Sequence, residues 1–167
     1  MKLNKWRKWT GQGVSFLLLL FIISSVADWW RGRDLIHQPI PDITVYDIEG
    51  KAINLAQLSQ QQAPTLIYFW GTWCPVCNYV SPAVSWLSQH YQIVSVALRS
   101  GEPDRVRQYL EHHDYEFNTI NDPQNRLGAA WGIRVTPTLV VIKDGKIQYY
   151  TTGFTSLPGI WWRLWLA

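Results

Sequence analysis

The hydrophobic positions of this chain fall into one long apolar run near its start and several shorter blocks further on. Residues 65–70 and 92–98 are predominantly apolar stretches with the length of a buried strand. Residues 139–142 form a third such stretch, followed by a Lys-Asp-Gly-Lys hairpin turn at 143–146 and a returning strand over 147–152. The pattern therefore predicts a sheet whose central strands are buried.

Blocks with apolar residues at helical spacing separate these strands, and short polar loops join them. Two short strand candidates, residues 44–47 and 51–54, and a brief helical turn come before the first central strand. We expect helices over four further segments: residues 78–87, 102–112, 121–132 and 156–165. Strands that alternate with helices and end in a hairpin and a helix predict an α/β fold, a mixed sheet with helices on both faces.

The long apolar run, residues 14–23, follows a short basic segment without acids. A helix from Thr10 to Trp30 would be about 30 Å long, which is enough to span the core of a bilayer. Tryptophans flank the run at positions 6, 9, 29 and 30, as in the aromatic belts of membrane proteins. We expect an uncleaved transmembrane helix, although the small residues up to Ala27 also suit a cleaved export signal.

Basic residues fix the expected orientation of this anchor. Four of them, Lys2, Lys5, Arg7 and Lys8, precede it, whereas those that follow closely are accompanied by acids. By the positive-inside rule the N-terminus lies in the cytoplasm. The predicted segments are a cytoplasmic tail over 1–9, the anchor over 10–30, a linker over 31–40 and a folded domain over 41–167. We expect that domain on the periplasmic, extracytoplasmic side of the inner (plasma) membrane, where disulfides persist.

Composition narrows the function classes. The chain of 167 residues, 47% hydrophobic and 14% aromatic, has room for one core and is not a disordered protein. Its formal charge of +3 is small, so nucleic-acid binding has no support. Cys74 and Cys77 are its only cysteines, too few for a small secreted fold held together by several disulfides. A four-ligand zinc site would need two further ligands. The four histidines lack the spacing of such ligands, and we expect no metal site.

The two cysteines lie where a predicted strand gives way to a predicted helix. A thiolate in the first turn of a helix faces unpaired backbone N–H groups and the positive end of the helix dipole, so its anionic form is favoured. Cys74 is the expected nucleophile, and Cys77, one turn further on the same face, can close a disulfide with it. Pro75 suits an early helix position because its missing N–H is not needed there. From spacing alone, half of a metal site is the alternative.

Further motifs relate this segment to a family. The sequence Trp73-Cys74-Pro75-Val76-Cys77, the helix proline Pro82 and the Val135-Thr136-Pro137-Thr138 segment ahead of a hairpin resemble the thioredoxin superfamily. With the N-terminal anchor and the Trp-Gly-Thr-Trp lead-in, the chain looks like its membrane-tethered, periplasm-facing branch. That branch includes TlpA-, ResA- and DsbE-type thiol reductases and suppressor-of-copper-sensitivity D proteins, and the Cys-Pro-Val-Cys order most resembles the last. The likeness covers residues 41–167.

This resemblance implies a redox-active disulfide between Cys74 and Cys77 and no other cofactor. It also implies that the peptide bond before Pro137 is cis and that this proline lies against the disulfide. The backbone of Thr136 is then expected to pair with an extended substrate segment. The implied partners are protein disulfide substrates and a membrane electron donor of the DsbD type. The residues implied to tune the site lie beside the cysteines: Trp73, Pro75 and Val76.

The chain departs from the family at two buried acids. Thioredoxins carry an Asp six residues before the first cysteine, where this chain has Tyr68. ResA-type reductases carry a Glu three residues after the second cysteine, where it has Val80. We expect Tyr68 to be a core strand residue rather than a proton relay. We expect His112 and His113 at the solvated end of a helix rather than as a metal pair.

The sequence thus predicts a membrane-anchored thiol:disulfide oxidoreductase that reduces protein disulfides through Cys74 and Cys77. A disulfide oxidase or isomerase is an open alternative, because the sequence does not set the direction of electron flow. A copper(I) chaperone that binds the metal through the same two thiolates is another. The aromatic helix over residues 156–165 is expected to pack on the sheet rather than touch the membrane.

Overall fold

The computed structural model describes residues 40–167, together with Leu19 and Ile23. The predicted tail, anchor and linker otherwise lie outside the described residues. Within the described part, no helix is long and apolar enough to cross a membrane. The structure therefore concerns the domain that follows the predicted linker.

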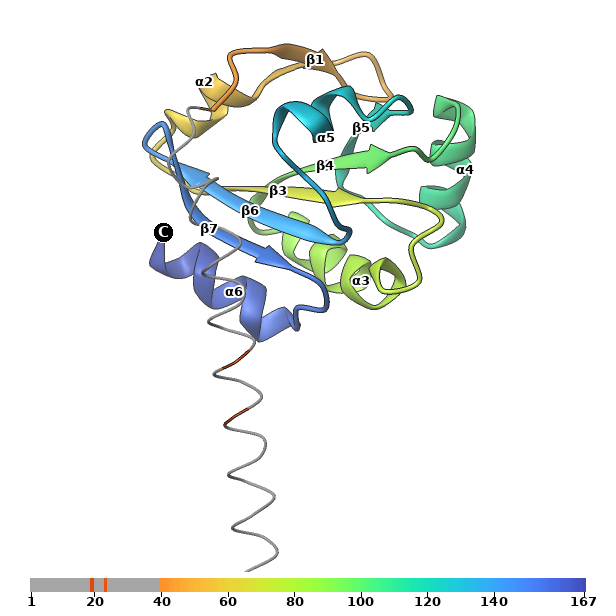
Figure 1. The fold of residues 1–167 in the computed structure, drawn as a ribbon. Coiled ribbons are helices and arrows are strands. Elements are labelled where there is room, and N and C mark those ends of the chain that lie inside the picture. Colours follow the sequence, from red (N-terminus) through yellow and green to blue (C-terminus); the bar gives the residue numbers. More distant parts are fainter. Residues whose placement is uncertain (1–18, 20–22, 24–39) are drawn as a thin grey trace, which may run out of the picture.

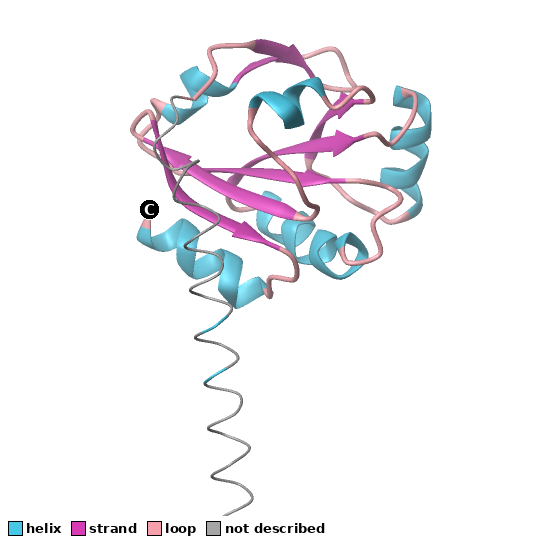
Figure 2. Ribbon diagram, in the orientation of Figure 1, coloured by secondary structure: helices cyan, strands magenta, loops and turns pink. Residues whose placement is uncertain are grey.

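One five-stranded mixed sheet forms the centre of this domain, in the order β5-β4-β3-β6-β7 (Figure 1; Figure 2). β3, β4 and β5 run parallel to one another, and β6 is antiparallel to both β3 and β7. The strands have these bounds: β3 Thr65–Trp70, β4 Gln92–Leu98, β5 Asn118–Asp122, β6 Thr138–Lys143 and β7 Lys146–Thr152. The predicted mixed sheet is confirmed, and β3 and β4 coincide with the two longest apolar stretches of the domain.

The apolar run of β3 explains its central place. All six residues are buried, because a strand lies on each side of β3 and both faces of the sheet are covered. Leu66, Tyr68 and Trp70 belong to the core on one face, whereas Ile67 and Phe69 belong to the core on the other. A strand buried on both faces has no solvent-facing positions, so its sequence does not alternate. It ends directly before the segment that carries both cysteines.

Helices cover both faces of the sheet, as predicted (Figure 1). One face carries α3 Cys77–Ser88, α4 Pro103–His112 and α6 Leu157–Leu166. The other carries α2 Leu55–Ser59, α5 Arg126–Ala130 and a small hairpin of β1 Thr44–Tyr46 and β2 Ala52–Asn54. The first of these two apolar layers is the one that contains both cysteines.

The edge strand β5 is not among the strands that the sequence predicts. The prediction of a helix from Asn121 was wrong, because Asn121 and Asp122 end a strand that pairs with β4, and α5 starts only at Arg126. The strand reads Asn-Thr-Ile-Asn-Asp and is too polar for hydrophobic periodicity to reveal. Asp122 then fixes the start of α5, because its two carboxylate oxygens accept the N–H groups of Arg126 (2.7 Å) and Gly128 (2.9 Å).

The last helix, α6, packs on the sheet through a narrow stripe. Ile160 and Leu164, one turn apart, are buried in the core beside α3. Trp161, Trp162 and Trp165 do not join them, since they are 44%, 41% and 68% exposed. The predicted packing of this helix on the sheet is confirmed: its buried contacts are aliphatic, and the partly exposed Trp162 also packs edge-on against Tyr149 of β7.

Candidate active site

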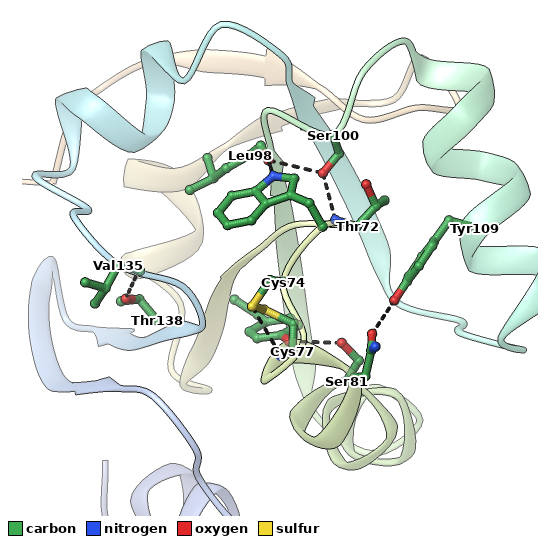
Figure 3. Close-up of a disulfide and its surroundings, with 12 residues drawn as sticks. Thr72, Cys74, Cys77, Ser81, Leu98, Ser100, Tyr109, Val135 and Thr138 are labelled. Atoms are coloured by element: carbon green, nitrogen blue, oxygen red, sulfur yellow. Dashed lines mark hydrogen bonds between the residues drawn. A yellow bond between two sulfur atoms is a disulfide. The ribbon is translucent and has the colours of Figure 1, made fainter.

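Cys74 and Cys77 form a disulfide between the end of β3 and the start of α3 (Figure 3). Their Cα atoms are 5.3 Å apart. Cys77 is completely buried, whereas Cys74 keeps 4% of its surface exposed. Of the two cysteines, Cys74 is therefore the one that a partner reaches from solvent.

A backbone amide points at the first cysteine. The Cys77 N–H donates to the Sγ atom of Cys74 at 3.2 Å. The expectation that Cys74 lies in the first turn of a helix was wrong, because α3 begins at Cys77. Residues 74–77 form a tight turn instead, closed by a hydrogen bond from the Cys77 N–H to the Cys74 carbonyl at 3.1 Å. The turn still supplies an amide donor to Sγ, which favours a thiolate at Cys74.

The lead-in to the cysteines is tied to the end of β4. The Trp73 indole N–H donates to the carbonyl oxygen of Leu98 at 2.9 Å, and the Thr72 N–H donates to the Ser100 hydroxyl at 3.0 Å (Figure 3). Gly71 allows this arrangement, since a Cβ atom there would lie 2.7 Å from the Trp73 Nε1 atom. Trp73 nevertheless stays 55% exposed. It is held in place and presents an aromatic surface beside Cys74.

The loop before β6 carries the predicted substrate-binding residues. The peptide bond between Thr136 and Pro137 is cis, as the family resemblance implies. The Thr138 hydroxyl donates to the Val135 carbonyl at 2.8 Å and closes the loop. Figure 3 shows Val135 and Thr138 on the side of the disulfide away from Tyr109 and α4. Val135 is 50% exposed, so the loop adds an apolar side chain to the surface near the site.

Phe154 is a residue of this region that the sequence analysis missed. The backbone N–H of Gly153 donates to the Pro137 carbonyl at 2.8 Å, and Phe154 follows directly. Thr152 pairs with Thr138 across β6 and β7, so Phe154 lies two residues beyond the last pair of these strands. Its side chain is 66% exposed. The signal in the sequence was an aromatic residue just after the returning strand, but strand register was needed to place it.

Tyr68 is fully buried, as the sequence predicts for a core strand residue. Its hydroxyl lies 2.9 Å from that of Ser81, which is also fully buried and comes one turn after Cys77 on α3. Burial raises the pKa of Tyr68 well above the usual range of a phenol, and the Ser81 hydrogen bond only partly opposes this. Val80, the other departure from the family, is an apolar core residue. The sequence gives no sign that Ser81 would be the partner of Tyr68.

The two adjacent histidines of the sequence analysis lie at the C-terminal end of α4. His112 is exposed in the last turn of α4, as predicted, and Glu102 is exposed at its N-cap. His113 is less solvated than predicted, since its ring stacks on Tyr109 with centroids 4.2 Å apart. Over the part of the chain that the structure describes, no group of three or more His, Cys, Asp or Glu side chains is arranged to hold a metal ion.

A buried Cys-x-x-Cys disulfide at the end of a central strand, opposite a cis-proline loop, defines a thioredoxin-like thiol:disulfide oxidoreductase. Comparison with known proteins agrees with this class. Residues 36–150 match the model of the AhpC/TSA family. The chain belongs to that family, and it is similar to its DsbE- and ResA-like members.

Curated relatives include a thioredoxin-like protein of Haemophilus influenzae, 44% identical over 100% of this chain and 98% of its own length. The thiol-disulfide oxidoreductase ResA of Geobacillus thermodenitrificans is 30% identical over 68% of this chain and 67% of its own. Among solved structures, a secreted Mycobacterium tuberculosis disulfide oxidoreductase homologous to E. coli DsbE has a TM-score of 0.65 and 21% identity. The likeness covers 75% of this chain and 96% of the Mycobacterium tuberculosis chain. That structure supports the fold alone.

Proposed function

We propose that this protein is a membrane-anchored, periplasm-facing thiol:disulfide oxidoreductase that reduces protein disulfides. The observation that carries the proposal is the Cys74–Cys77 disulfide with the Cys77 amide aimed at the Cys74 Sγ atom. The names of the DsbE and ResA relatives support the same reaction class. No cofactor beyond the two sulfurs takes part.

The two cysteines have different roles. In the reduced protein the Cys74 thiolate attacks one sulfur of a substrate disulfide, so that a mixed disulfide forms and one substrate thiolate leaves. The Cys77 thiolate then attacks the Cys74 sulfur, which releases the second substrate thiolate and closes the Cys74–Cys77 bond. Two electrons pass from the protein to the substrate, whose two thiolates take up protons. Cys74 makes the first attack because Cys77 has no exposed surface.

Residues around the disulfide bind and orient the substrate. We assign backbone pairing with an extended substrate segment to Thr136, beside the cis Pro137. Trp73 and Val76, which are 55% and 41% exposed, offer apolar contact on the other side of Cys74. Pro75 lacks an N–H and so limits the number of amide donors near the thiolate, which tunes the redox potential.

The oxidised protein must be reduced again before each turnover. We propose a DsbD-type membrane electron donor, which transfers two electrons by thiol exchange at Cys74. The predicted anchor at residues 10–30, with a cytoplasmic N-terminus, supports this assignment because it holds the domain near such a donor. The likeness to suppressor-of-copper-sensitivity D proteins rests on the Cys-Pro-Val-Cys order and belongs to the proposal.

Catalysed reduction of insulin by dithiothreitol tests the roles of the cysteines. Cys74→Ser should abolish catalysis. Cys77→Ser, reduced, freed of dithiothreitol and then mixed with insulin, should accumulate mixed disulfides that are visible on a non-reducing gel. Ser156→Ala is a suitable control, because Ser156 is exposed and its side chain makes no helix-capping bond. Full turnover by the Cys74→Ser protein would contradict the proposal.

The redox state of the dithiol in cells tests the direction of the reaction. After acid trapping and thiol alkylation, a mostly reduced Cys74–Cys77 pair supports a reductase, and a mostly oxidised pair indicates an oxidase. Tight, stoichiometric copper(I) binding by the reduced protein without thiol exchange would favour a chaperone instead. Protease digestion of spheroplasts tests the orientation, because a periplasm-facing domain should be cleaved while the membrane is intact.

A further inference from the structure

Helix α6 is apolar around almost its whole circumference. Its sequence, Leu-Pro-Gly-Ile-Trp-Trp-Arg-Leu-Trp-Leu, has Arg163 as its one charged residue and no acid. Only the stripe of Ile160 and Leu164 is used by the core. The exposed residues form a second apolar surface, here called the tryptophan face: Trp161, Trp162, Trp165 and Leu166. A helix that is hydrophobic all round is typical of a protein interior or of contact with lipid.

The rings of the tryptophan face are held in a fixed arrangement. Trp161 and Trp165 stack with centroids 6.3 Å apart and planes 17° from parallel. Trp162 packs edge-on against Tyr149 of β7 at 5.9 Å, and the Arg163 guanidinium lies 4.9 Å from the centroid of its ring. These contacts hold Trp161 against Trp165, and Trp162 against β7. The face is thus ready for a partner without rearrangement.

We infer that the tryptophan face lies on the lipid headgroups of the membrane in which the chain is anchored, an inference that rests on the proposed anchor. Tryptophan suits this interface because its ring is apolar while its N–H remains able to bond to water or headgroups. Arg163 donates to the Gly159 carbonyl and is the one charged side chain of α6, so the helix carries a positive charge that suits anionic lipids.

The length of the linker keeps the domain at the membrane. Residues 31–40 join the predicted span to the domain, and ten extended residues reach about 35 Å. A domain of this size is also roughly 35 Å across. The domain therefore stays within about its own width of the bilayer, where a weak contact of three indoles forms as an intramolecular event.

Contact of α6 with the membrane would also set the distance of the active site from the membrane surface. Helices α6 and α3 lie side by side on one face of the sheet, and the disulfide is at the start of α3 (Figure 1). Docking α6 on lipid holds α3 near the membrane surface and leaves the Cys74 end of the sheet open. That position suits exchange with a donor that is itself in the membrane.

Site-specific photocrosslinking in the full-length protein tests this inference. A benzoylphenylalanine replaces Trp165 in one variant and Tyr46 in the control, and each protein is inserted into vesicles of phosphatidylethanolamine and phosphatidylglycerol. The two positions are matched, since both are aromatic and 68% and 65% exposed, but β1 with Tyr46 lies on the opposite side of the sheet. After irradiation, the Trp165 position should carry several times more lipid adduct than the Tyr46 position.

Three other outcomes would overturn the inference. Equal lipid labelling at the two positions means that α6 has no preferred contact, and a dimer-sized adduct at the Trp165 position assigns the face to a second copy. If alkaline extraction releases the chain from the vesicles, the chain has no membrane anchor, and the inference about α6 fails with it. Insulin reduction by the same vesicles is measured in parallel, so a failure of the proposed redox function is seen separately from a failure of α6 to meet lipid.

Discussion

The hydroxyl of Tyr68 lies 2.9 Å from the hydroxyl of Ser81 in the interior of the domain. Ser81 is on α3, one helical turn after Cys77. Tyr68 takes the place of the buried acid of thioredoxins, and its pKa is raised by burial. A buried phenol that keeps its proton does not accept another one from Cys77 at neutral pH. The pair therefore joins β3 to α3, and Cys77 passes its proton to a different acceptor.

Replacing Tyr68 by Phe should lower stability and leave catalysis nearly intact. The Tyr68→Phe change removes one hydrogen bond, and Ser81 can turn to a backbone carbonyl of its own helix, so the free energy of unfolding should fall by about 1 kcal/mol. Urea unfolding followed by circular dichroism measures this change. Insulin reduction should stay within about twofold of the wild-type rate, because a role in proton transfer by general acid–base catalysis would cost about a hundredfold or more.

Ser81→Ala provides the matched control for that experiment, because it removes the other half of the same bond. If the two hydroxyls act as one pair, the double variant should be destabilised by less than the sum of the two single variants. A large fall in the rate of insulin reduction in Tyr68→Phe alone would instead assign the phenol a part in the reaction.

Stability should depend on pH in the alkaline range because of the same phenol. The pKa of Tyr68 is higher in the folded protein than the value of about 10 of an unfolded chain, so the folded state holds the proton more tightly. The resulting stability is fully present below about pH 9 and is lost progressively as pH rises above about 10 towards the higher pKa of the folded state. Urea midpoints should therefore fall more steeply above about pH 10 in the wild type than in Tyr68→Phe.

Gly71 should not tolerate a side chain. In Gly71→Ala the new Cβ atom would lie 2.7 Å from the Trp73 Nε1 atom and 3.1 Å from the Leu98 carbonyl oxygen. The indole must then move and lose its hydrogen bond to Leu98, which we expect to cost about 1–3 kcal/mol. Urea unfolding checks the value. Trp73→Phe should suppress much of the effect in the double variant, and an additive result would show that the clash lies elsewhere.

The parts of the fold that follow from local sequence were predictable. β3 and β4 are buried on both faces, so their apolar runs mark them directly. The disulfide pairing and the cis bond before Pro137 followed from the family resemblance. β5 was missed because a polar edge strand is stabilised by pairing with β4, which leaves no period in its own residues.

The details of the site depend on contacts between helices and strands, and these contacts cannot be predicted from the pattern of a single sequence. The sequence shows that Tyr68 replaces an acid, but its partner Ser81 depends on how α3 is rotated against β3. The aromatic helix α6 was expected to pack on the sheet, and it does so, but Trp161, Trp162 and Trp165 stay partly exposed. Their exposure follows from the packing of Ile160 and Leu164, which uses the opposite side of the helix.

Phe154 should contribute to the binding of protein substrates and not to the thiol chemistry. It lies just beyond β7, where the Gly153 N–H bonds to the Pro137 carbonyl, and it is 66% exposed. Phe154→Ala should remove an apolar contact with the substrate segment that we propose to pair with Thr136. We expect KM for insulin to rise by about tenfold, equivalent to about 1.4 kcal/mol, with kcat unchanged.

A small disulfide substrate distinguishes a role of Phe154 in substrate binding from a role in the thiol chemistry. Oxidised glutathione has no extended apolar segment, so Phe154→Ala should reduce it as fast as the wild type does. Tyr46→Ala removes an equally exposed aromatic ring from the opposite side of the sheet and should leave both substrates unaffected. If Phe154→Ala slowed the reduction of insulin and glutathione to the same extent, the side chain would be acting on the cysteines themselves. The substrate segment would then have to pass along another side of the disulfide.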